Sequence, residues 1–116
     1  SKIEPCDYAG NAKTNFTKGK TAYFKVYVKN NALEGKNVTI SLVVIDDLNF
    51  PIGQITLNDL VLAPGTSILA MNISIPDHAF IGVATVHVNA FTDSLGEGGV
   101  AYCPEMTATF FIEDNP

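Results

Sequence analysis

The chain has 116 residues, of which 47% are hydrophobic and 16% are charged, and its formal net charge is −5. This length and apolar content fit one folded domain with a sizeable core and exclude a disordered chain. All seven basic residues are lysine, so the sequence excludes a basic surface for nucleic acid, and its apolar runs are too short for insertion into a membrane.

The first stretch, SKIEPCDYAGNAKTN at residues 1–15, shows no strong strand pattern. We interpret it as an N-terminal arm and residues 16–113 as the core of a single domain that spans residues 1–116. The next stretch, TAYFKVYVKN at residues 21–30, alternates apolar and polar side chains, with Phe24 and Val26 on one face and Lys25 and Tyr27 on the other. A spacing of two predicts a strand with one face on the core.

Further strands are expected at residues 36–46, 54–57, 66–75, 82–93 and 106–113, separated by clusters of Gly, Pro, Asn and Asp. Thr39 and Ser41 are expected on an outward face. The inward positions of the four longer strands are Val38, Ile40, Leu42 and Val44, then Leu69, Met71, Ile73 and Ile75, then Ala84, Val86, Val88 and Ala90, then Met106, Ala108, Phe110 and Ile112. About seven short antiparallel strands at this spacing predict an all-β sandwich.

Four segments carry a family resemblance: KGKTAYFKVYVKN, NVTISLVVIDDLNFPIG, LAPGTSILAMNISIP and GVATVHVNAFTD. Over residues 16–113 the chain resembles the immunoglobulin-like β-sandwich modules of secreted and cell-surface proteins, especially archaeal and bacterial ones. It lacks the Cys…Trp…Cys core of antibody-type domains. The resemblance implies a non-enzymatic role in adhesion, surface coats or filaments, and some such filaments assemble by lending a terminal strand to a neighbour.

Cys6 and Cys103 are the only cysteines. With His78, His87 and Met106, Cys103 would complete the ligand inventory of a blue-copper site. Copper-binding β-sandwich proteins, however, have a ligand histidine between the cysteine and the methionine in the sequence. In this chain Pro104 and Glu105 occupy those positions. We favour a Cys6–Cys103 disulfide, which in the chain-entropy model stabilises the fold by about 4 to 5 kcal/mol, and we expect no resident metal or cofactor.

Three asparagines, Asn15, Asn37 and Asn72, begin N-x-S/T triplets and are candidate glycosylation sites. Together with a pair of cysteines suited to an oxidising compartment, they favour a glycoprotein outside the cell or on its surface.

The outward positions of three strands contain large apolar residues, which predicts an interaction face for a protein partner or a second copy. Its members are Val43, Ile45, His87, Phe91 and Phe111. A covering loop or a bulge that reverses one strand would remove this face.

Catalytic chemistry has no support in the sequence, because no G-x-S-x-G elbow occurs. Asp46 and Asp47, with Asp59 and Asp77, could bind calcium, although turn aspartates are an ordinary feature of surface turns. We therefore expect a non-enzymatic structural or interaction domain. The alternatives left open are a module that binds glycans or metal ions and, behind it, a cupredoxin-like redox protein.

Overall fold

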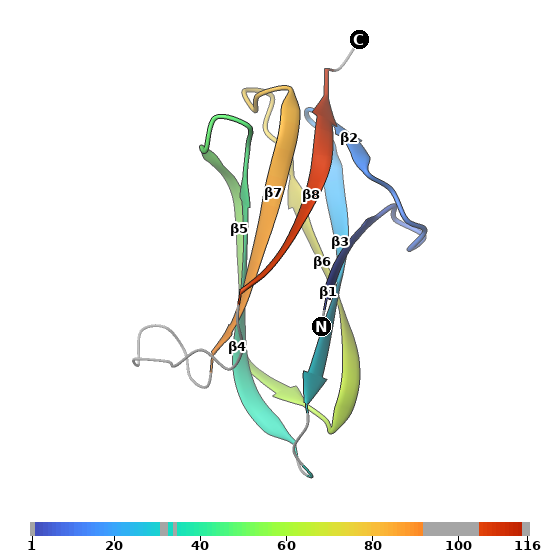
Figure 1. Cartoon of the computed structure of the whole chain (residues 1–116), viewed down its shortest axis with the longest axis vertical. Coiled ribbons are helices and arrows are strands. Elements are labelled where there is room, and N and C mark those ends of the chain that lie inside the picture. Colours follow the sequence, from blue (N-terminus) through green and yellow to red (C-terminus); the bar gives the residue numbers. More distant parts are fainter. Residues whose placement is uncertain (1, 31–32, 34, 92–104, 115–116) are drawn as a thin grey trace.

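The computed structural model describes residues 2–30, 33, 35–91 and 105–114. In this part of the chain the fold is all-β, with two sheets packed face to face (Figure 1). The strands are β1 (Lys2–Cys6), β2 (Asn15–Thr17), β3 (Thr21–Asn30), β4 (Lys36–Ile45), β5 (Pro51–Leu62), β6 (Gly65–Ser74), β7 (Gly82–Phe91) and β8 (Met106–Glu113).

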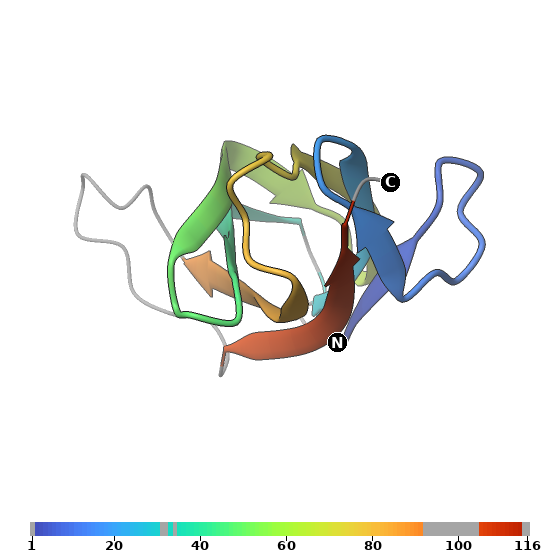
Figure 2. The same cartoon turned by 90° about the horizontal axis from the view of Figure 1, so that it is seen from above.

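The smaller sheet has the strand order β1-β3-β6, and the larger sheet has the order β2-β8-β7-β4-β5. Neighbouring strands are antiparallel except β2 and β8, which run parallel. Seen from above, the two sheets form two layers, and β1 lies beside β8 along one side of the sandwich (Figure 2). The predicted all-β sandwich is confirmed.

The N-terminal stretch contributes more to the fold than an arm would. Residues 2–6 form β1, which pairs with β3, and β2 begins at Asn15 and pairs with β8. Ile3 and Cys6 are buried, while Pro5 is tolerated because β1 is an edge strand. These two short strands bring the total in the described residues to eight instead of about seven, and each lies at an edge of a different sheet.

The core contains the inward rows that the alternation predicts for β3, β4 and β7, all buried. Phe16, Phe24 and Phe110 form an aromatic cluster at its centre, with ring centroids 5.3 to 6.3 Å apart. Because Phe16 comes from β2, Phe24 from β3 and Phe110 from β8, this cluster ties the N-terminal stretch to both sheets.

β4 and β5 each differ in one respect from what the sequence pattern suggests. Thr39 and Ser41 lie on the outward face of β4 but are only 1% and 8% exposed. Thr39 pairs with Phe91 on one side, and its hydroxyl donates to Asn58 Oδ1 at 3.4 Å on the other. β4 is a central strand with longer side chains on both neighbours, so its short outward residues are covered.

β5 starts at Pro51, earlier than the expected residue 54, because its place at a sheet edge tolerates a proline. Gly53 then packs against β6: a Cβ added there would lie 2.7 Å from Ile73 Cδ1. Pro51 and Gly53, which favour a turn in the sequence, therefore lie at the start of a strand. Gly53 also allows the two sheets to approach each other. No helix in the described residues is long and apolar enough to cross a membrane.

Candidate functional site

The predicted interaction face is assembled from three neighbouring strands of the larger sheet. Val43 and Ile45 lie on β4, His87 and Phe91 on β7, and Phe111 on β8, with Val43 directly opposite His87. Of the five, Phe111 is exposed and the other four are half-buried. The structure therefore brings these residues onto one sheet but leaves little of their apolar surface open to water.

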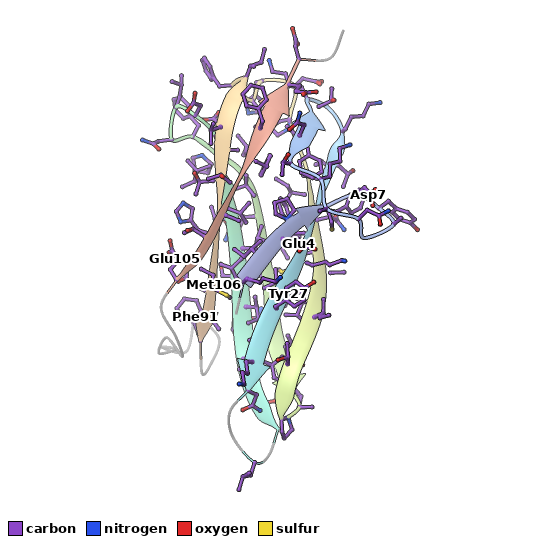
Figure 3. The ribbon with its side chains drawn as sticks, turned by 45° about the vertical axis from the view of Figure 1, so that its right-hand side comes forward. Glu4, Asp7, Tyr27, Phe91, Glu105 and Met106 are labelled. Carbon is purple, nitrogen blue, oxygen red and sulfur yellow. The ribbon has the colours of Figure 1, made fainter. Side chains whose placement is uncertain are left out.

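A polar network occupies the middle of this face. His87 Nδ1 and Glu105 Oε1 are 2.5 Å apart, and Asn89 Nδ2 donates to Glu105 Oε2 at 3.1 Å. The hydrogen bond to His87 lowers the pKa of the Glu105 carboxyl, and the bond to Asn89 adds to the effect. Figure 3 shows Glu105 and Phe91 together on this side of the sandwich. The centre of the face is suited to polar contacts.

The exposed apolar surface is concentrated at one end of the sandwich instead. The turn between β4 and β5 exposes Leu48 and Phe50, and the turn between β6 and β7 exposes Phe80 and Ile81. Val83 and Phe111, a cross-strand pair on β7 and β8, continue this surface onto the sheet. These six residues, each 42% to 59% exposed, are called the apolar end below.

Asp46 holds the two turns of the apolar end together. Its side chain is buried, with the residue 4% exposed. Asp46 Oδ1 accepts the backbone N–H groups of Leu48 and Phe50, both at 3.0 Å, and Oδ2 accepts the N–H of Phe80 at 3.3 Å. One buried carboxylate thus fixes the backbones that carry three of the six apolar side chains.

Gly82 allows the same two turns to lie close together. Gly82 has φ 141°, and a Cβ added to it would lie 2.5 Å from Asp47 Oδ2. Only a residue without a side chain can let the turn after β4 approach the start of β7 in this way. Asp46 is thus explained by turn structure, and Asp47 lies against the glycine that follows the neighbouring turn.

Sequence reasoning missed the apolar end because it interpreted both segments only as turns that separate strands. A signal was present: DLNF at residues 47–50 and DHAF at residues 77–80 both place a phenylalanine three residues after an aspartate. A large aromatic residue inside a turn, away from the alternating strand rows, has no core position to fill. Such residues are candidates for contacts with another molecule.

A shallow pocket of about 290 Å³ adjoins the apolar end. It is lined by Lys18, His78, Ala79, Phe80 and Ile81. Its residues come from the turn after β2 and from the turn between β6 and β7. The pocket is open to solvent and belongs to the same surface as the apolar end.

The described residues of the blue-copper inventory do not share one location. His87 is on the outward face of β7, whereas Met106 packs against the core on β8. His78 lies in the turn before β7, and Cys103 is outside the described residues. Within residues 2–30, 33, 35–91 and 105–114, no group of three or more His, Cys, Asp or Glu side chains could hold a metal ion.

The Cys6–Cys103 disulfide stays a prediction, since Cys103 lies outside the described residues. Cys6 is buried, and burial raises the pKa of its thiol. Cys6 pairs with Tyr23, next to the Phe24–Phe110 contact, whereas β8 begins at Met106 beside Val88.

The three candidate glycan acceptors, Asn15, Asn37 and Asn72, are all exposed. Asn15 Nδ2 also donates to Glu113 Oε1 on β8, 2.8 Å away. Their exposure is compatible with glycosylation, which stays a prediction.

No protein-family model matches the chain, and no curated protein is similar enough in sequence to match it. Among solved structures, 23 chains match. One of them, the C-terminal domain of Wzt, superposes with a TM-score of 0.68 over 98% of this chain and 72% of that one, at 6% identity. At this identity the likeness shows the fold alone, a β-sandwich.

Proposed function

We propose that this chain is a non-enzymatic, immunoglobulin-like structural domain of an extracellular or cell-surface protein, and that it assembles with further copies through its apolar end. The observation that carries the proposal is the set of six large apolar side chains exposed together at one end. Large apolar side chains exposed near one another are costly in water and tend to mark protein contacts.

The geometry favours the apolar end over the sheet face predicted from the sequence. At the apolar end, Asp46 fixes the backbones of the two turns in the free molecule. Binding a partner there would therefore cost little additional conformational entropy. At the centre of the sheet face, binding an apolar partner would remove water from the His87–Glu105–Asn89 network. Phe111 belongs to both surfaces and would lie at their border.

Three features support a place outside the cell. The acceptor asparagines of all three N-x-S/T triplets are exposed, the cysteine pair fits an oxidising compartment, and the chain resembles surface modules of archaea and bacteria. A domain that contacts its neighbours through one end is suited to a surface layer or a filament.

Sedimentation velocity over a range of concentrations tests this proposal. Phe80→Asp should weaken self-association, because it places a charge within the apolar end. Val61→Asp is the matched control, since Val61 is an apolar residue, 66% exposed, near the end of β5. Equal association of wild type and Phe80→Asp, or equal weakening by both variants, would contradict the proposal. Protease treatment of intact cells, followed by detection of the domain, tests its location.

A second candidate function, glycan binding, is favoured by a row of tyrosines on the outer face of the smaller sheet. Tyr8 is 87% exposed and meets Tyr23 edge to face, with centroids 5.7 Å apart. Lys2 Nζ lies 4.7 Å from the centroid of Tyr27. Figure 3 shows Glu4 and Tyr27 on this sheet. Binding on a glycan array that is lost in Tyr23→Ala would support this function over assembly.

A further inference from the structure

The two sheets of the sandwich are unequal, and β6 is an edge strand of the smaller one. The larger sheet has five strands and the smaller sheet has three. On one side of the sandwich β1 packs beside β8 (Figure 2). On the other side β5 and β6 are the edge strands of their sheets, and Gly53 on β5 packs against Ile73 on β6.

The inward side chains of the two edge strands β5 and β6 are less completely buried than those of a central strand. On β5, Ile55, Leu57 and Leu60 pack against the core but are only partly buried, and so is Leu69 on β6. The inward residues of the central strand β4 are almost completely buried by comparison.

Most of the sheet edges carry features that prevent pairing with another chain. β1 contains Pro5 and two charged residues, and β2 is three residues long. β5 begins with Pro51 and has a positive φ of 54° at Asp59, close to an irregularity in its pairing with β4.

β6 has none of these features. Its ten residues, GTSILAMNIS, include no proline and no charged side chain, although the chain as a whole carries a net charge of −5. Its outward row includes Ile68, which is 59% exposed. Among the described strands only β3 pairs with β6, so its other edge has backbone donors and acceptors available for an incoming strand.

We propose that β6 pairs antiparallel with β6 of a second copy, so that two three-stranded sheets become one six-stranded sheet. A two-fold axis at Ala70 places Leu69 opposite Met71 of the second copy, and it keeps inward residues opposite inward residues. The second copy fits because a strand without charge meets no like-charge repulsion when it pairs with itself.

This inference goes beyond the proposed function and does not depend on it, because it concerns the β6 edge and not the apolar end. A pair made through β6 has two apolar ends. Contacts between those ends would extend pairs into a chain of molecules, which is one way to build a filament.

The test uses paired charges at Ala70, which is exposed and lies at the two-fold axis. Ala70→Lys and Ala70→Glu each place two like charges opposite one another across the pair. Sedimentation velocity of the full chain, made without glycans, should show a dissociation constant raised tenfold or more for either variant alone. An equimolar mixture of the two should recover the dimer as a heterodimer.

Thr109→Lys and Thr109→Glu are the matched controls, because Thr109 is exposed on β8 rather than on β6. Far-UV circular dichroism and thermal melts establish that each variant is folded. A wild-type chain that stays monomeric up to millimolar concentration, a dimer that survives both Ala70 variants, or a mixture that fails to recover it would each overturn the proposal. Phe80→Asp separates the two ideas, since it should reduce assembly beyond the dimer and leave the β6 pair intact.

Discussion

Replacing Asp46 by alanine tests how the apolar end is built. The substitution removes a buried carboxylate that accepts backbone N–H groups from Leu48, Phe50 and Phe80. The first two groups belong to one turn and the third to another, so the variant should loosen the turns and separate them. Asp47, the next residue, is exposed and provides the matched control in Asp47→Ala.

The magnitude follows from the three hydrogen bonds. A bond to a charged acceptor contributes about 1.5 to 3 kcal/mol, and a buried group left without a partner costs about 1 to 3 kcal/mol. Leu48, Phe50 and Phe80 are exposed residues, so water can replace part of what is lost. We expect Asp46→Ala to reduce the free energy of unfolding by about 2 to 4 kcal/mol, and Asp47→Ala to change it by less than about 0.5 kcal/mol.

Urea unfolding followed by circular dichroism measures both variants. For a domain of this size Asp46→Ala should lower the Tm by roughly 8 to 16 °C. Asp46→Asn should fall between wild type and Asp46→Ala, because the amide retains one acceptor oxygen. If Asp46→Ala is as stable as Asp47→Ala, the reasoning about this carboxylate is refuted.

Three further predictions follow from other contacts. Gly53→Ala should destabilise the fold by about 1 to 3 kcal/mol, because the added Cβ would lie 2.7 Å from Ile73 Cδ1. In urea unfolding, the double variant Gly53→Ala with Ile73→Val should recover part of this loss. If the effects of the two substitutions are simply additive, this contact is not the cause. The pKa of the Glu105 carboxyl is lowered in the folded state, so its contribution to stability is present above its unfolded pKa and is lost as the pH falls through its folded pKa. Glu105→Gln should therefore flatten the decline of the unfolding free energy in acid. A decline identical to that of wild type would show that the pair with His87 does not contribute to stability. The Cys6–Cys103 bridge predicts that mass spectrometry finds no alkylated cysteine before reduction and two after reduction and unfolding; two alkylated cysteines in the unreduced, unfolded chain would remove the bridge.

The strands of the core could be predicted from the sequence because their burial depends on local alternation. In β3 the residues Ala22, Phe24, Val26 and Val28 are all buried, as a spacing of two requires. Such a pattern is present in a single strand and needs no knowledge of its neighbours. The same reasoning failed for Thr39, whose burial depends on Phe91 and Asn58 in the strands on either side.

Edges and turns were harder to predict for a related reason. Pro51 and Gly53 favour a turn by themselves, yet β5 begins there because it is an edge strand that packs closely on Ile73. β1 has too few alternating residues to be recognised alone, and its pairing with β3 forms only in the folded chain. The apolar end depends on a contact between two turns more than 30 residues apart, from Asp46 to Phe80. No local pattern contains that information.

Hydrogen–deuterium exchange of the wild-type chain, compared between dilute and concentrated solution, tests the central claim most directly. If the molecule assembles through its apolar end, exchange should slow at residues 46–50 and 76–83 as the concentration rises. Unchanged exchange in these two turns, with slowing confined to the tyrosine row of the smaller sheet or absent throughout, would contradict the account.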